Sequence, residues 1–165
     1  MKFQQKVNFD YGFGIPGEVA FDGPTRAKPG VLKSDDEKNN VFGRVFTLNA
    51  DGKTIGAGGE GVFWGILGDP KTHTYTGRVG DDASSLYVAN GVVGSFYDMA
   101  LINVLTSEAA QIGDNLWYDT GTGEIIAQDK TVTTLAGHLQ VPNAKVTRLP
   151  QESATGGLIV AQLTN

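Results

Sequence analysis

Short apolar stretches separated by turn-forming residues follow one another along most of the chain. Val and Phe dominate residues 41–48, which predicts a strand, and the mainly apolar residues 157–165 predict a final strand. The apolar stretch 99–105 is compatible with a buried strand or a short helix, because periodicity alone does not separate the two. Glycines before and after this stretch favour the strand.

Turn-forming residues predict where the strands reverse. Asp51-Gly52 and Asn90-Gly91 are dipeptides that favour the tight turns of β-hairpins. The first follows the Val- and Phe-rich strand, and the second predicts a hairpin over residues 84–96.

The remaining segments complete an all-β pattern. Residues 115–128 predict a third hairpin with its turn at 120–123, and the stretches 130–141 and 144–150 are rich in threonine and valine. Residues 107–114 form a connector with room for one helical turn. In total we expect about eight to ten short strands, with a turn roughly every 8 to 12 residues. The chain is therefore predicted to be an all-β, jelly-roll-like sandwich or small barrel of short antiparallel strands.

The front of the chain does not share this pattern. Residues 8–27 contain four aromatic residues, four glycines and two prolines, without a helical or strand-like rhythm. We therefore divide the chain into an extended N-terminal arm over residues 1–32 and a single β-rich domain over residues 33–165.

The composition supports one folded domain. The chain has 165 residues, of which 40% are hydrophobic, and this is enough to bury a core. Its 23 glycines and its low share of charged residues, 19%, fit many short elements joined by tight turns. It contains no cysteine, which excludes disulfides, zinc–thiolate sites and thiol nucleophiles.

The charge disfavours two classes of partner. The formal net charge is -5, whereas a nucleic-acid-binding protein normally presents a basic face. An acidic chain is also poorly suited to an anionic membrane surface, and no apolar run approaches the roughly 18 residues that a membrane-spanning helix needs. We therefore expect neither nucleic acid nor membrane as a partner, and synthesis in a reducing cytoplasm.

Two motif-like stretches have a plain structural explanation. Gly56, Gly58 and Gly61 match the G-x-G-x-x-G spacing of dinucleotide-binding loops, but that motif requires a helix directly after it. Residues 62–65 are a poor helix start, so we predict a glycine-rich bend between strands. Asp119 opens the Asp-Thr-Gly triplet of aspartic proteases, which bring two such carboxylates together. Because Asp and Gly also favour turns, a hairpin turn is the simpler interpretation.

The titratable residues do not form a recognisable metal or catalytic set. His73 and His138 are the only histidines, and neither has a His, Asp or Glu three or four residues further on. The acidic stretches 35–37 and 81–82 lack the spaced oxygen ligands of a calcium-binding loop. We therefore predict no catalytic residue, no cofactor and no metal site.

Several stretches give the chain a family likeness. They are the front segment KVNFDYGFGIPGEVAFDGPTRA, then NVFGRVFTLNADG and GVFWGILGDPKTHTYTG, and later NGVVGSFYDMALINV with IGDNLWYDTGTGEI. Over nearly its full length the chain resembles the cement, or head-decoration, proteins of tailed bacteriophages. The resemblance implies a small β-rich domain that sits as a dimer or trimer on the outside of the phage head, over joints between major capsid protein subunits. It also implies a protein that is not an enzyme.

The resemblance assigns a function to the arm. On this hypothesis the chain is a structural virion protein, made in the host bacterial cytoplasm, that binds the major capsid protein and copies of itself. Large apolar residues of the arm are then predicted to make the contacts with partners. These candidate contact residues are Phe9, Tyr11, Phe13, Ile15 and Phe21. The opposite possibility, that these side chains pack on the core of their own domain, stays open.

Two other functions fit parts of the sequence. Trp64 and Trp117, if exposed, are suited to stacking on sugar rings, as in a carbohydrate- or receptor-binding β module of a phage tail. Asp119 is the residue that a small hydrolase would use, provided that two copies of the chain came together in a dimer.

Overall fold

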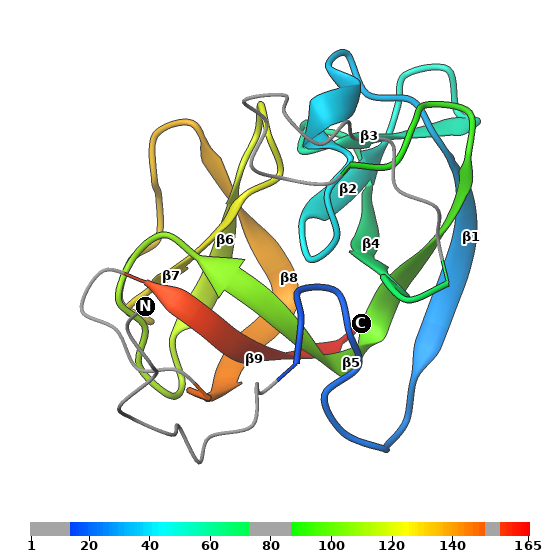
Figure 1. Cartoon of the computed structure of the whole chain (residues 1–165). Helices are drawn as coiled ribbons and strands as arrows, with labels where there is room; N and C mark the ends of the chain where they lie inside the picture. The colour runs from blue at the N-terminus through cyan, green and yellow to red at the C-terminus, as the bar shows by residue number, and fades with distance from the viewer. Residues whose placement is uncertain (1–13, 73–86, 151–155) are drawn as a thin grey trace, which may run out of the picture.

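The computed structural model describes residues 14–72, 87–150 and 156–165 (Figure 1). These residues contain nine strands and one short 3₁₀ helix, which confirms the predicted all-β class. The elements are β1 (Arg26–Leu32), η1 (Glu37–Asn39), β2 (Val45–Leu48), β3 (Thr54–Ala57), β4 (Phe63–Gly68), β5 (Val93–Thr106), β6 (Asn115–Asp119), β7 (Ile125–Gln128), β8 (His138–Arg148) and β9 (Gly157–Thr164). In this part of the chain, no helix has the length and apolar character needed to cross a membrane.

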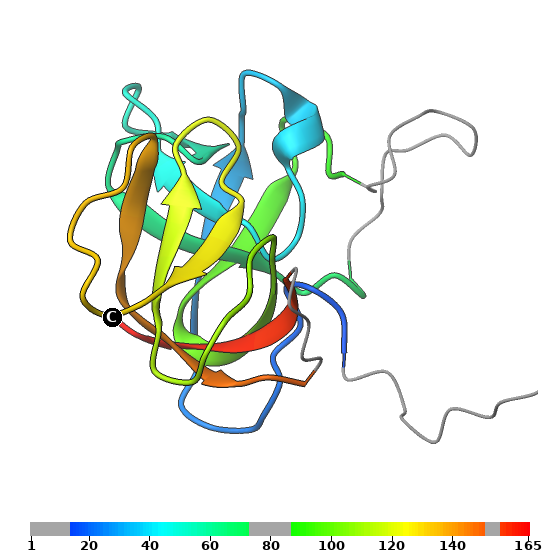
Figure 2. The same cartoon turned by 90° about the vertical axis from the view of Figure 1, so that its left-hand side faces the viewer.

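The strands close into two rings that share β5. In the first ring β1 pairs with β3, β3 with β2, β2 with β4, β4 with β5, and β5 with β1 again. In the second ring β5 pairs with β7, β7 with β6, β6 with β8, β8 with β9, and β9 with β5. We call these rings the first barrel and the second barrel. They lie on either side of β5 in Figure 1, and Figure 2 shows β8 and β9 curving around the second.

Ring closure gives every described strand a neighbour on both sides. The closure is partial, because β1 pairs with β3 only at Val31 and Leu32, so one edge of β1 over residues 26–30 has no strand neighbour among the described residues. Two of the ten pairings, β1 with β3 and β5 with β7, are parallel, and these two differ from the predicted antiparallel arrangement. Both are very short, and they join strands that are far apart in the sequence.

Two of the three predicted hairpins are confirmed. β2 and β3 pair around Asp51-Gly52, and β6 and β7 pair around the turn at 120–123. The predicted hairpin over 84–96 is wrong in its described part, because residues 87–92 form no strand. The side chain of Asn90 bonds instead to both the amide and the carbonyl of Ser34. The turn therefore packs on the segment after β1 and does not fold back on β5.

Three other segments differ in detail from the sequence pattern. β8 runs without interruption through Pro142-Asn143, where the prediction placed a break between two strands. Residues 130–137 lie outside any strand, and the connector 107–114 has no helical turn. Residues 26–32, predicted as the end of the arm, form β1 and pair with β5 over most of their length. In this structure the arm therefore ends before Arg26.

Two separate cores fill the barrels. The first contains Leu32, Phe42, Phe46, Ile55, Leu67, Val88 and Phe96. The second contains Val45, Ile66, Ala100, Ile102, Val104, Leu116, Tyr118, Ile125, Ala127, Val141, Ala144, Val146, Ile159, Ala161 and Leu163. Burying each large apolar side chain contributes about 1.5–3 kcal/mol, so both cores contribute substantially to stability.

The two cores lie on opposite faces of β2 and β4. The adjacent residues Val45 and Phe46 belong to different cores, and so do Ile66 and Leu67. Because successive side chains of a strand point to opposite faces, these strands are buried on both sides. This explains why their sequences read as continuous apolar runs and do not alternate with polar residues.

The glycine-rich bend joins the two barrels. Gly58 donates its amide to the carbonyl of Val45, and the amide of Val45 donates to the carbonyl of Gly123, each at 2.9 Å. Gly59 donates to the carbonyl of Thr120 at 2.7 Å. A side chain at Gly58 would place its Cβ 2.6 Å from that same Thr120 oxygen. The predicted bend is confirmed, and its glycines allow this close backbone contact with the β6–β7 turn.

We predict that Gly123→Ala destabilises the fold far more than Gly52→Ala. Both residues have a positive φ, 74° and 66°, which costs a non-glycine residue about 1–2 kcal/mol. Only at Gly123 would the new Cβ collide with backbone, at 2.4 Å from the carbonyl oxygen of Val45. Urea unfolding should show a loss of about 1 kcal/mol for Gly52→Ala and roughly 3 kcal/mol for Gly123→Ala. Equal losses would contradict a tight junction between the barrels.

Candidate interaction site

The base of the arm lies beside β5. Gly17 donates its amide to the carbonyl of Asn103 at 2.8 Å, and Ala20 donates to the carbonyl of Leu101 at 2.7 Å. The amide of Asn103 donates in return to the carbonyl of Glu18 at 2.9 Å. These bonds fill the stretch of β5 between its pairings with β1 and with β7. The arm is therefore fixed to the strand that the two barrels share.

Gly17 lets the base of the arm approach the body closely. Its φ is 83°, and a Cβ there would lie 2.8 Å from the carbonyl oxygen of Leu67 and 2.9 Å from Phe42 Cβ. The carbonyl of Gly17 also accepts the amide of Asp69 at 3.2 Å. A residue with a side chain would push the arm away from β4, so the position requires glycine.

Glu18 closes the turn at the arm base. Its carboxylate accepts the amide of Ile15 at 3.3 Å and forms an ion pair with Lys71. The hydrogen bond from Lys71 is the largest cause that lowers the pKa of Glu18. The pair is solvent-exposed, so it directs the path of the chain more than it stabilises the fold.

Two of the five candidate contact residues lie in the described part of the chain. Ile15 is 41% exposed and Phe21 is 44% exposed, which is unusual for large apolar side chains on a folded body. The ring of Phe21 also packs under the guanidinium of Arg148, with 5.2 Å between the charged carbon and the ring centre. Phe9, Tyr11 and Phe13 lie outside the described residues. A contact with a partner stays a prediction for all five.

Asp98 anchors the strand that follows the arm. Its side chain is 7% exposed and accepts hydrogen bonds from Arg26 Nε at 2.8 Å and Arg26 Nη2 at 3.1 Å, while Lys28 Nζ lies 3.1 Å away. Arg26 also bonds to the carbonyl of Asn165, and the amide of Asn165 bonds to the carbonyl of Asp98. Burial alone would raise the pKa of Asp98, but the two basic side chains outweigh it and lower the pKa. The carboxylate therefore stays charged and ties β1 to β5 and to the end of the chain.

The carboxylate of Asp119 is occupied by a turn. It accepts the amides of Gly121 at 2.9 Å and Thr122 at 2.7 Å, and the hydroxyl of Thr122 at 3.0 Å. Burial alone would raise the pKa of Asp119, but these bonds lower it. The geometry matches the turn interpretation.

The tryptophans do not form a sugar-binding platform. Trp117 is 3% exposed and belongs to the interior. Trp64 donates its ring N–H to the carbonyl of Pro29 at 3.3 Å, and Lys28 Nζ lies 4.7 Å from the centre of its ring. This side chain is therefore already covered on one side. The tail-module alternative loses the paired aromatic surface on which it depended.

Within residues 14–72, 87–150 and 156–165, no group of three or more His, Asp or Glu side chains is placed so that it could hold a metal ion. His138 begins β8, with Nδ1 2.9 Å from the carbonyl oxygen of Ala136. Asp36 caps η1 by accepting the amide of Lys38. His73 and residues 81–82 lie outside the described part of the chain.

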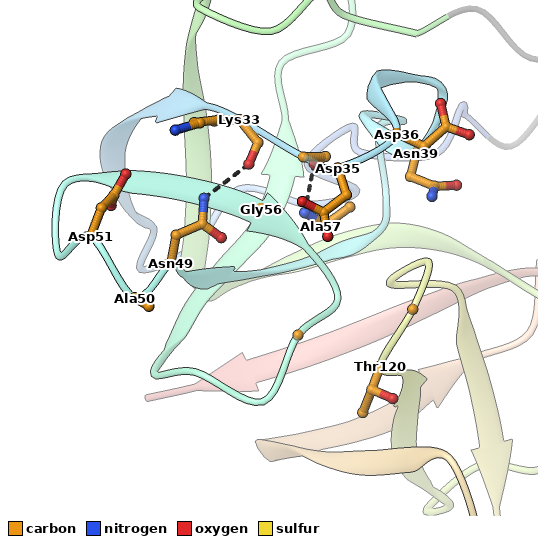
Figure 3. A pocket seen from close by; sticks show the side chains of 13 residues that line it. Lys33, Asp35, Asp36, Asn39, Asn49, Ala50, Asp51, Gly56, Ala57 and Thr120 are labelled. Carbon is orange, nitrogen blue, oxygen red and sulfur yellow. Dashed lines mark hydrogen bonds between the residues drawn. The ribbon is translucent and has the colours of Figure 1, made fainter.

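A polar pocket of about 550 Å³ lies between the segment after β1, the β2–β3 hairpin and the β6–β7 turn (Figure 3). Asn49 crosses it to donate to the carbonyl of Lys33 at 2.9 Å. Two of its three carboxylates, those of Asp36 and Asp51, already accept hydrogen bonds from nearby backbone amides. Bonds from Thr54, with that from Lys53, lower the pKa of Asp51 to about 2. The hydrogen bonds of Asp36 and Asp51 are those of capping and turn residues.

Comparison with known proteins assigns the chain to a family. Residues 3–164 match the family model described as "Structural cement protein (E217 gp24/Pam3 gp6)". The chain belongs to the phage structural cement protein family. The resemblance inferred from the sequence is therefore confirmed. Comparison with curated proteins finds no match.

A solved structure shows the same fold as this cement protein. It is titled "The capsid of Myoviridae Phage XM1", and one of its chains matches with a TM-score of 0.65 and 17% sequence identity. The match covers 100% of this chain and 99% of that chain. The arrangement of strands is thus shared over the full length, despite the low identity.

We predict that Asp98→Asn makes the cement protein less stable at pH 7 by about 2 kcal/mol. The pKa of Asp98 is lowered in the folded state, so its charge stabilises the fold above the ordinary Asp pKa of 3.8. That contribution is lost as the pH falls below this value. Thermal unfolding should show the wild-type protein and Asp98→Asn converging at acidic pH. Glu124→Gln, at the exposed end of the Arg44 ion pair, serves as the control and should cost less than about 1 kcal/mol.

Proposed function

We propose that this protein is a non-catalytic component of the virion that binds the outside of the phage head and cements neighbouring major capsid protein subunits. The match of residues 3–164 to the structural cement family is the observation that carries this proposal. A cement protein works by burying surface on subunits that must not separate. It needs a stiff body, enough contact area and no cofactor.

The closed barrels supply the stiff body. The two rings of paired strands share β5, so the two barrels form one body. Contact with a partner then uses the side-chain surfaces of the body, the short unpaired edge of β1 over residues 26–30, and the arm.

The arm supplies contact area. A specific, stable interface buries more than about 1,000 Å² in total, and large apolar side chains usually contribute most of its energy. The proposed contacts are Phe9, Tyr11, Phe13, Ile15 and Phe21. Ile15 and Phe21 are already held near the surface by the bonds at the arm base, which reduces the entropy lost on binding.

The proposal includes assembly of the protein with itself. Dimers or trimers would multiply the weak contacts of each arm and hold several capsid subunits at once. Neither a nucleic acid nor a membrane is part of this proposal, in keeping with the net charge of -5.

Phage heads that lack the protein should break at a lower temperature than complete heads. The missing interfaces would otherwise oppose separation of the capsid subunits. Release of DNA on heating, followed by a fluorescent dye, measures this temperature. Adding the purified protein back should restore it, and unchanged breakage after complete removal would contradict the proposed function.

The double variant Phe9→Ala/Phe13→Ala should bind heads at least about tenfold more weakly, because two apolar anchors are lost. At a dilution where both proteins are monomeric, its thermal unfolding should match that of the wild-type protein if the arm lies on a partner. If the arm packs on its own domain, unfolding temperature falls and head binding changes little. Co-sedimentation with heads and calorimetry separate the two cases. Val62→Ala is the matched control, because this residue is 68% exposed and lies outside the arm.

A further inference from the structure

The outer side of β1 and of the first half of β5 is apolar and carries no charge. Leu32 points into the first core, and a Cβ on Gly30 would touch Ile55 and Phe96 of that core. Since side chains alternate along a strand, the odd-numbered residues of β1 point outward. We define the β1–β5 face by the residues Ala27, Pro29, Val31, Val93 and Ser95, with Tyr97 and its partner Asp69 at one end of it.

This face is solvent-exposed in the single chain. Val31 and Val93 stand directly opposite each other in the pairing and are 38% and 56% exposed. Val92 next to them is 36% exposed. On a strand whose other side is buried, the outward positions are normally polar. Contiguous outward apolar residues are typical of a surface that another element covers.

The arm contains a segment that fits such a face. Residues 8–27 as a whole have no strand-like rhythm, but the shorter stretch 6–13, KVNFDYGF, alternates strictly. Its odd positions are Val7, Phe9, Tyr11 and Phe13, and its even positions are Lys, Asn, Asp and Gly. Such alternation is the pattern of an extended segment with one side buried.

We propose that residues 6–13 of one copy lie extended across the β1–β5 face of a second copy, with the odd-numbered side chains against it. This contact between copies deepens the proposed cement function, and its role in the virion rests on that function. It is one contact by which the copies would assemble. The spacing of the two surfaces matches. Alternate residues of an extended chain repeat about every 6.8 Å, both in the arm and along β1.

The reach of the arm favours a second copy over the same chain. Gly14 lies against the side chain of Asn103, and five fully extended residues place Phe9 within about 18 Å of it. Val93 is ten residues from Asn103, about 33 Å along β5. In Figure 1 the described arm begins low in the view, beside β5 and β9, and β1 ends at the upper right. The aromatic residues of the arm therefore fall short of the Val31–Val93 end of their own face.

A contact of this kind joins two different surfaces. The arm of each copy binds another copy, and the β1–β5 face of each copy binds the arm of another. Copies related by a rotation axis then close into a ring in which every arm and every face is used. In the same arrangement, the apolar face of every copy is covered by an arm.

The absence of cysteine from the chain allows a direct test by disulfide trapping. Val93→Cys, labelled with a heavy isotope, is mixed in turn with Val7→Cys, Phe9→Cys, Tyr11→Cys or Phe13→Cys and oxidised, both in solution and on heads. Mass spectrometry then identifies bonds between unlike chains. At least one odd-numbered position should link to Val93→Cys about tenfold more than the even-numbered Asn8→Cys and Asp10→Cys do. Ile112→Cys, which is 69% exposed, replaces Val93→Cys in the control mixture.

Three outcomes would overturn the proposal. The arm cysteines could link to Ile112→Cys as often as to Val93→Cys, or a bond could form only within one chain that carries both cysteines. The third outcome is that no bond forms either in solution or on heads. As a second measurement, Val93→Asp should shift the protein toward the monomer in light scattering. At a dilution where both proteins are monomeric, its unfolding temperature should equal that of the wild-type protein, because contact between copies stabilises only the assembled state. Head binding is scored separately by co-sedimentation, so loss of the contact between copies is distinguished from loss of the cement function.

Discussion

The structure depends on one strand serving two barrels. β5 pairs with four other strands. It has a bulge at Asp98, and a given side of β5 faces a different core before and after this bulge. Before the bulge, Phe96 points into the first core, and after it Ala100 and Ile102 point into the second. Because a one-residue insertion exchanges the two sides of a strand, the extra residue is what lets one strand complete both rings. The buried carboxylate at this point has to be neutralised, and Arg26 and Lys28 of β1 do so.

Sharing one strand has a consequence for how the body can bind. Two separate barrels joined by a linker would move relative to each other, whereas here the backbone of β5 and the Val45–Gly58–Gly123 contacts hold them together. The outer sides of β2 and β4 become part of the second core, which removes those surfaces from solvent. The accessible surfaces include the β1–β5 face, the polar pocket and the base of the arm. The interior contributes stiffness, and any binding has to use such outer surfaces.

Local turn chemistry was readable from the sequence, and long-range pairing was not. The turns at Asp51-Gly52 and at Asp119 formed as predicted because their hydrogen bonds lie within three residues. Asn90-Gly91 failed as a hairpin because Asn90 bonds to Ser34, which is distant in the sequence. β1 has no strand pattern of its own, and its partner β5 comes more than sixty residues later. At the interaction site, the sequence identified Ile15 and Phe21, which are exposed, but it missed the attachment at Asn103 and the apolar β1–β5 face. No alternation of polar and apolar residues marks that face, since Pro29 and Gly30 interrupt it.

The attachment of the arm to β5 determines how a pulling force on the arm would be transmitted to the body. Tension on the arm reaches the bonds of Gly17, Glu18 and Ala20 to β5. These bonds lie side by side along an antiparallel pairing, so a pull along the strand loads them together and does not open them one after another. From β5 the load passes into β9 over eight residue pairs and into β1 over six, and so into both barrels. Attachment to a peripheral strand would load a single pairing, whereas attachment to the shared strand distributes the force over the whole body.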